Sequence, residues 1–265
     1  MKSVRIQDTE IAYRIDGTQD PARPWIVMVH ALGSDHRMWD AQAAFLAPRY
    51  RILRYDLRGH GASGLAPGET TLERLADELK LLLDELYIAQ VHFVGLSLGG
   101  MIGQQLALRH QVRLRSLTLA DTASRAAPDA PAQIEARIQQ ARRAGMGGLV
   151  PATMERWFTA GFRARHPEVV AAVGQVLRDT PVEGYAACAR VVARIALTSR
   201  LAVIRCPTLI LVGDQDRGTP PAEAELIAQA IHGSRLVTLR DAAHLSNLEQ
   251  AEAFNASLER FLAEH

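Results

Sequence analysis

The chain has 265 residues, of which 48% are hydrophobic and 22% charged, and its formal net charge is +1. This is the composition of an ordinary globular protein, long enough for one or two domains. The basic residues are spread along the chain, which excludes the basic footprint of a nucleic-acid-binding protein. No apolar run approaches the roughly 18 residues of a membrane-spanning helix. The first residues lack a signal-peptide pattern, so we expect a soluble cytoplasmic protein.

The N-terminal part of the chain predicts four strands and then a helix. Period-two alternation of apolar and polar residues predicts a strand pair over residues 4–6 and 11–16. The continuous apolar run at residues 26–29 is typical of a strand buried on both faces in a parallel sheet. A further strand, RILRY, ends at Asp56 in a loop that contains glycines. A helix follows, with Thr70 and Glu73 in a capping-box pattern at its start.

The alternation of strands and helices continues to residue 120 and resumes after residue 200. We expect a strand at residues 91–94, a helix from about Leu98 and a strand at residues 117–120. Later, PTLILVGD and RLVTL predict two strands separated by the helix PAEAELIAQAI. A terminal helix begins with a second capping-box pattern, Ser246 and Glu249. This alternation predicts the α/β class, with a mostly parallel central sheet flanked by helices.

Residues 125–200 interrupt the alternation. They contain helix-like pieces divided by prolines and no convincing buried strand, and they are far longer than an ordinary crossover connection. We interpret them as a helical cap inserted into one core, which is formed by residues 1–124 and 201–265. Cys188, within the cap, and Cys206 have no metal-ligand spacing, and we expect both to be reduced, buried thiols.

The sequence Gly95-Leu96-Ser97-Leu98-Gly99 fits the pattern G-x-S-x-G between a predicted strand and a predicted helix. In that context the serine occupies a tight, strained turn above the carboxyl end of the sheet, and small neighbours are needed to avoid clashes. A serine hydroxyl at the start of a helix, with backbone N–H groups beside it, suits nucleophilic attack on a carbonyl. Ser97 is therefore the predicted nucleophile.

A serine nucleophile needs a base, and this arrangement requires the chain order serine, acid, histidine. His244 satisfies that order, because it follows the last predicted strand by a short loop. His30 and His60 also lie in loops at this edge of the sheet, but both precede Ser97. We interpret His30 as a structural residue whose ring holds its own loop by hydrogen bonds to backbone.

Two aspartates, Asp214 and Asp216, follow the predicted strand TLILVG. Asp216 is favoured as the acid that orients His244, because it lies three residues after Gly213 and so deeper in the loop. Asp214 is interpreted as a solvated turn residue. Asp121, which ends the strand before the cap, is the alternative position for the acid.

The backbone N–H groups of Leu32 and Leu98 are the predicted oxyanion donors. Leu98 follows the nucleophile, and Leu32 lies in the loop HALGSD after the strand WIVMV. Two such donors would each stabilise the transition state by about 3 kcal/mol. The resulting mechanism needs neither a metal nor an organic cofactor.

Five segments together resemble the α/β-hydrolase superfamily across essentially the whole chain: HALGSDHRMWDAQ, YRILRYDLRGHGAS, VGLSLGG, GDQDRGTP and AAHLSNLEQAEAF. The cap segments RWFTAGF and EGYAACARV are similar, more narrowly, to the 3-oxoadipate enol-lactonases of the β-ketoadipate pathway. This resemblance implies hydrolysis of an enol-lactone to 3-oxoadipate in aromatic catabolism, with Ser97, Asp216 and His244 as the catalytic residues and Trp157 in the pocket. The loop HALG departs from the lactonase pattern and is closer to the general esterase form.

Such a lactone carries a free carboxylate, so its pocket should offer a cation. Arg125 and Arg156 in the cap are the candidates, since a guanidinium grips a carboxylate bidentately. The expected partner is thus a small ester or lactone, rather than nucleic acid or membrane. Two alternatives stay open: a general carboxylesterase or cofactor-independent perhydrolase with the same triad, and a non-catalytic small-molecule receptor.

Overall fold

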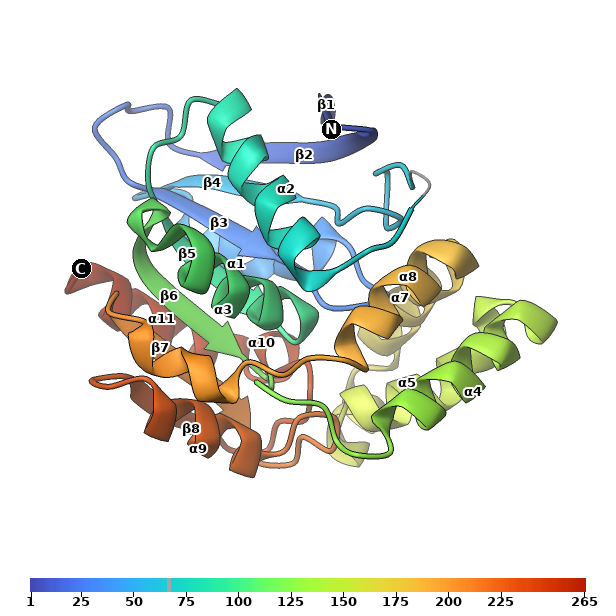
Figure 1. Ribbon diagram of the computed structural model, residues 1–265. Helices are drawn as coiled ribbons and strands as arrows, with labels where there is room; N and C mark the ends of the chain where they lie inside the picture. The colour runs from blue at the N-terminus through green and yellow to red at the C-terminus, as the bar shows by residue number, and fades with distance from the viewer. Residues whose placement is uncertain (66–67) are drawn as a thin grey trace.

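The computed structural model describes residues 1–65 and 68–265 and is built on one eight-stranded sheet with the order β1-β2-β4-β3-β5-β6-β7-β8 (Figure 1). The strands are β1 (Lys2–Ile6), β2 (Thr9–Gly17), β3 (Trp25–Val29), β4 (Arg51–Tyr55), β5 (Val91–Leu96), β6 (Leu114–Ala120), β7 (Thr208–Gly213) and β8 (Arg235–Leu239). Strand β2 pairs antiparallel with β1 and with β4, and all other neighbours are parallel. The mostly parallel α/β sheet predicted from the sequence is confirmed.

Helices cover both faces of the sheet, as Figure 1 shows with α2 and α3 in front and α1 and α11 behind. The helices on the front face are α2 (Leu72–Glu85), α3 (Leu98–His110) and α9 (Pro221–Ala230), and those on the back are α1 (Asp40–Leu46) and α11 (Ala251–Ala263). Successive residues of β3 point to opposite faces. Val27 and Val29 therefore join the core under α2 and α3, and Ile26 and Met28 join the core under α1 and α11.

Between β6 and β7 the chain forms five α-helices beyond the carboxyl ends of the strands, towards which the arrow of β6 points in Figure 1. They are α4 (Ala130–Ala144), α5 (Val150–Trp157), α6 (Ala160–Arg165), α7 (Pro167–Asp179) and α8 (Val182–Val192). The two ends of this segment lie side by side. Arg125 and Ala196 form an isolated antiparallel bridge, and the Leu197 N–H donates to the Ser124 carbonyl at 2.7 Å.

Helix α8 approaches the loop after β4 very closely. A Cβ on Gly184 would lie only 2.0 Å from the carbonyl oxygen of Gly59, so no side chain fits there. Gly59 itself has a φ of +71°, which other residues rarely adopt. The Cys188 thiol, one turn further along α8, contacts the carbonyl oxygen of Arg58 at 3.8 Å. These contacts fix the start of α8 to the sheet side of the molecule.

Both predicted capping boxes are wrong. Helix α2 is capped by Thr71, whose hydroxyl accepts from the Arg74 N–H, and not by Thr70. The terminal helix is broken at residue 250 into the short α10 (Ser246–Glu249) and α11. Ser246 donates its hydroxyl to Asp121 instead of capping α10. These polar side chains take tertiary partners in place of the local ones that the sequence pattern suggested.

Both cysteines are free, and Cys188 is fully buried while Cys206 is partly buried. Burial raises the pKa of the Cys188 thiol to about 12, and also raises that of Cys206, to about 11. Neither thiol is therefore a reactive thiolate near neutral pH. Among the helices of the described residues, none combines the length and the apolar character needed to cross a membrane.

Candidate active site

Ser97 lies at the junction of β5 and α3, with a backbone φ of 56° and ψ of −115°. A positive φ is unfavourable for a residue with a Cβ, and such strain gathers at functional sites. The glycines around it are required by space. A Cβ on Gly95 would lie 2.4 Å from the carbonyl oxygen of Gly99, and one on Gly99 would lie 2.2 Å from that of Val29. The strained turn predicted for the G-x-S-x-G segment is confirmed.

Asp216 and His244 form a direct hydrogen bond, with 2.8 Å between the Asp216 Oδ2 and the His244 Nδ1 atoms. The loop after β7 fixes the carboxylate from its other side. Asp216 Oδ1 accepts the N–H groups of Gly218 at 2.7 Å and Thr219 at 3.1 Å, and the Thr219 hydroxyl donates to Oδ2 at 2.7 Å. Because Nδ1 donates its proton to Asp216, Nε2 is the nitrogen left free to accept a proton from a substrate or nucleophile.

Burial alone would raise the pKa of Asp216. The charge of His244, together with hydrogen bonds from His244 and Thr219, outweighs burial and lowers the pKa of Asp216 below its ordinary value. The carboxyl is therefore ionised near neutral pH. An ionised Asp216 stabilises a positive charge on the imidazole, which is what a base needs when it takes a proton.

The two other aspartates that the sequence offered do not contact His244 through a hydrogen bond in the described residues. Asp214 is exposed, and its carboxylate accepts the Ala242 N–H at 3.3 Å. Asp121 is fully buried; it accepts the Gly213 N–H at 2.9 Å and pairs with the Ser246 hydroxyl at 2.5 Å. Of the three, Asp216 alone is bonded to the histidine.

Ser97 and His244 both line a cavity of about 180 Å³ at the carboxyl edge of the sheet. Leu32, Trp157 and Arg156 line the same cavity, as the sequence predicted. The Trp157 ring lies 6.3 Å from the His244 ring, centroid to centroid, with the planes tilted by 31°. The cavity is thus walled by the sheet edge on one side and by the helices of the 125–200 segment on the other.

Arg125 does not line this cavity, so its predicted place in the pocket is wrong. Its exposed guanidinium pairs with Glu223 of α9 at 3.1 Å, outside the cavity. Arg125 lies at the start of the 125–200 segment, where it forms the bridge with Ala196. From this position its side chain extends towards α9.

Two further arginines that the sequence reasoning missed, Arg137 of α4 and Arg217, do line the cavity beside Arg156. Among the ion pairs of the described residues, none includes any of these three arginines. Burial and the nearby charge of Arg137 lower the pKa of Arg156. Arg137 and Arg156 are thus two neighbouring guanidinium groups without an ion-paired carboxylate. This part of the cavity is therefore favourable for an anion.

The loop after β3, which carries Leu32, is held by two buried histidines. His30 accepts the Leu57 N–H through Nε2 at 2.9 Å, and its Nδ1 donates to the Ala31 carbonyl at 2.8 Å. His60 accepts the Gly33 N–H through Nε2 at 3.1 Å. Burial lowers the pKa of both rings, so both are neutral, as these bonds require. The structural role predicted for His30 is confirmed.

Leu32 thus lies in a fixed loop beside Ser97, and Leu98 is the first residue of α3. The first N–H groups of a helix have no acceptor within the helix, so the Leu98 N–H is free of intrahelical bonding. This placement is compatible with the predicted pair of oxyanion donors, and their role stays a prediction.

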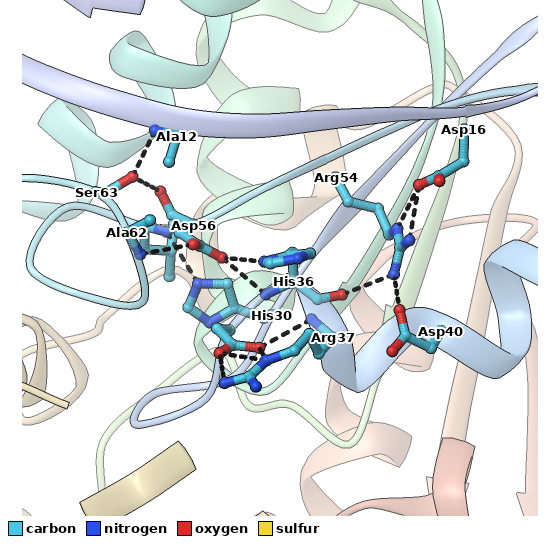
Figure 2. A network of polar contacts seen from close by, with 12 residues as sticks. Ala12, Asp16, His30, His36, Arg37, Asp40, Arg54, Asp56, Ala62 and Ser63 are labelled. Carbon is cyan, nitrogen blue, oxygen red and sulfur yellow. Dashed lines mark hydrogen bonds and ion pairs between the residues drawn. The ribbon is translucent and has the colours of Figure 1, made fainter. Parts of the chain in front are cut away.

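Asp56 joins the same loop to the one after β4 (Figure 2). Its carboxylate accepts from the His36 N–H at 2.9 Å, from the His36 Nδ1 at 2.8 Å and from the Ala62 N–H at 2.9 Å. Ligand atoms of Asp35, His36 and Asp56 come within 4.8 Å of one another, a spacing that a metal ion could bridge. The Asp35 carboxylate is, however, already paired with Arg37 at 2.6 Å. The group is therefore a satisfied hydrogen-bond network that stiffens the loop.

Comparison with known proteins agrees with this geometry. A family model described as the alpha/beta hydrolase fold matches residues 24–251. The chain therefore belongs to the α/β-hydrolase family. It is similar to 3-oxoadipate enol-lactonase 2 of Acinetobacter baylyi, with 35% identity over 253 residues, which cover 96% of this chain and 93% of that protein.

Two solved structures are similar over their whole length. The enol-lactonase from Burkholderia xenovorans LB400 superposes with a TM-score of 0.95 at 40% identity and covers 99% of this chain and 100% of its own. A thermophilic esterase from Thermogutta terrifontis gives a TM-score of 0.93 at 32% identity, covering 100% of this chain and 99% of its own. The protein is thus a hydrolase of the α/β fold related to enol-lactonases and esterases.

Proposed function

We propose that the protein hydrolyses a small enol-lactone through a covalent acyl-enzyme on Ser97. The observation that carries this proposal is the cavity shared by Ser97 and His244, with Asp216 hydrogen-bonded to the far side of the imidazole. This arrangement supports the assignment of Ser97 as nucleophile, His244 as its base and Asp216 as the orienting acid.

In the first step His244 Nε2 takes the hydroxyl proton of Ser97 as the serine oxygen attacks the lactone carbonyl. The N–H groups of Leu32 and Leu98 hold the oxyanion of the tetrahedral intermediate. Collapse of that intermediate breaks the ring C–O bond, and the enol oxygen leaves with the proton from His244 and tautomerises to a ketone. In the second step His244 takes a proton from water, the hydroxide attacks the ester carbonyl, and Ser97 leaves with that proton as the carboxylic acid is released.

The proposed substrate is 3-oxoadipate enol-lactone, a five-membered ring with one carboxymethyl arm. The names of the two enol-lactonases that this chain resembles support it. The cavity volume of about 180 Å³ also supports it, because a cavity of about 150 Å³ is known to hold benzene and longer acyl chains need more room. Arg137 and Arg156 would bind the carboxylate, and Trp157 would contact the ring.

In this proposal the helices of residues 125–200 act as a cap over a core formed by residues 1–124 and 201–265. The cap supplies Arg137, Arg156 and Trp157, and the core supplies the three residues that carry out the chemistry. Recognition and reaction would therefore lie on opposite walls of one cavity. A general carboxylesterase is the second candidate function, and the similarity to the Thermogutta terrifontis esterase favours it.

The test follows the loss of the enol-lactone's ultraviolet absorbance with the wild-type protein and with Ser97→Ala. We expect rapid turnover by the wild type and none above background by the variant, with circular dichroism unchanged. Turnover of the lactone with a higher kcat/KM than a short nitrophenyl ester would support the lactonase. Good ester cleavage with poor lactone turnover would favour the carboxylesterase, and activity in Ser97→Ala would contradict the mechanism itself.

A further inference from the structure

Glu249, the last residue of α10, lies behind the loop that carries His244. The residue is buried, with 9% of its surface exposed, and both of its carboxylate oxygens accept hydrogen bonds. Oε1 accepts the Ala243 N–H at 2.8 Å. Oε2 accepts both the N–H of Thr159 at 3.0 Å and its hydroxyl at 2.7 Å. One side chain therefore joins the residue before His244 to the residue two positions after Trp157.

The residue after His244 is joined to the same segment. The Leu245 N–H donates to the Trp157 carbonyl at 3.1 Å. The peptide N–H groups on both sides of the histidine are thus held by Glu249 or by the end of α5. Since the Trp157 and His244 rings also face each other in the cavity, a shift of this segment relative to the loop would move both of them.

We propose that Glu249 is a positioning residue, which couples the placement of His244 to the placement of the pocket wall at Trp157. This inference rests on the proposed function, since it assigns His244 the part of the base. Glu249 touches neither Ser97 nor the cavity in the described residues. It acts through Ala243 and Thr159, and its effect on the reaction is geometric.

The chemistry of the contact makes a carboxylate the best residue for this task. Burying a carboxylate is unfavourable unless it is hydrogen-bonded, and here three donors converge on its two oxygens. A glutamine of the same shape has one accepting oxygen, so its NH2 group would face either the Ala243 or the Thr159 donor. An alanine would leave all three donors without a partner.

The experiment compares Glu249→Ala and Glu249→Gln with Glu252→Ala, an exposed glutamate at the start of α11 that serves as the matched control. Active sites are counted by covalent labelling of Ser97 with a fluorophosphonate, read to completion by intact mass. Initial rates on the enol-lactone and on a nitrophenyl ester, measured with unlabelled protein, are then divided by the number of sites that labelling counts. This normalisation removes any loss that comes only from misfolded protein.

We expect kcat per labelled site to fall about 10- to 100-fold in Glu249→Ala, because a misplacement of about 1 Å in a catalytic group costs about 100-fold. KM should rise in the same variant, since Trp157 moves too. Glu249→Gln should lie between the alanine variant and wild type, and Glu252→Ala should match wild type.

Thr159→Val provides a second variant, which keeps Glu249 and removes the hydroxyl that donates to it and that also accepts the Phe162 N–H at the start of α6. Its effect and that of Glu249→Ala should be less than additive in the double variant, since Glu249→Ala already removes the contact with the Thr159 hydroxyl. Wild-type kcat per labelled site in Thr159→Val and in both Glu249 variants would overturn the inference and leave the proposed function standing. Failure of the wild-type protein to label at Ser97 would instead overturn the proposed function, and the inference with it.

Discussion

Asp121 and Asp216 are two neighbouring carboxyl groups whose surroundings move their pKa values in opposite directions. Burial and the charge of Asp216 raise the pKa of Asp121 well above its ordinary value, whereas His244 and Thr219 lower that of Asp216. Asp121 is therefore suited to be a neutral acid that holds the Ser246 hydroxyl and the Gly213 N–H. Separate environments of this kind assign different tasks to identical side chains.

The first prediction concerns these two aspartates. Asp216→Asn should lower kcat by about 10⁴-fold, because the histidine loses its orienting anion and takes the wrong tautomer. Asp121→Asn should retain kcat within a few-fold, because the amide oxygen can still accept the Gly213 N–H, and the amide NH2 can donate to the Ser246 oxygen in place of the bond that Ser246 now donates to Asp121. Steady-state kinetics of both variants on one substrate provide the check. The reverse order of damage would make Asp121 the acid.

The second prediction concerns pH and stability. Because the pKa of Asp121 is raised on folding, its stabilising contribution is present below the ordinary carboxyl pKa and is lost as pH rises through the folded-state pKa. Asp121→Asn removes that loss. The free energy of unfolding of the variant should therefore rise relative to that of wild type as the pH increases from about 5 to about 8. Urea denaturation at both pH values measures this difference, and a difference that is the same at pH 5 and pH 8 would show that Asp121 is already ionised in the folded protein at pH 5.

At the scale of elements, the contact between α8 and the loop at Gly59 fixes one side of the helical segment, and Glu249 fixes another. The third prediction is that Gly184→Ala destabilises the protein by about 1–3 kcal/mol, since its Cβ would overlap the Gly59 backbone. Gly147→Ala is the matched control, because its Cβ would meet only Arg178 at an ordinary 3.5 Å. Urea unfolding compares the two, and equal stability would contradict the close approach.

The strands were predictable because buried parallel strands are continuous apolar runs. The serine turn was predictable because only glycine fits at the positions on either side of the serine. The break between α10 and α11 was not, since Ser246 and Glu249 match a local capping pattern but bind Asp121, Ala243 and Thr159 instead. Local patterns carry no information about such distant partners.

The pocket arginines were the least predictable part of the site. The 125–200 segment is rich in arginine, and only the packing of its helices decides which guanidinium groups face the cavity. Arg156 was identified beside Trp157, while Arg137 on another helix was missed and Arg125 was wrongly included. Helix orientation, rather than composition, makes the difference.

At the scale of the whole molecule, a net charge of only +1 hides a local excess of positive charge in the cavity. The fourth prediction is that KM for the carboxylate-bearing lactone rises with ionic strength, since salt screens charges beyond about 10 Å at 0.1 M. KM for a neutral nitrophenyl ester should change little. Arg137→Ala and Arg156→Ala should each raise KM for the lactone about tenfold and leave that of the ester nearly unchanged. Equal salt dependence for both substrates would remove the arginines from substrate binding.

The bridge between Arg125 and Ala196 has a consequence for how such a protein can change. A segment that leaves and rejoins the sheet at one point can be exchanged as a single cassette, because its two junctions stay in place whatever lies between them. The loops between its helices can also vary in length at little cost, as doubling a flexible loop adds only about 0.6 kcal/mol of closure entropy. Transplanting this cassette between related hydrolases would alter which molecules enter the cavity. The strand order that holds Ser97 and His244 would stay the same.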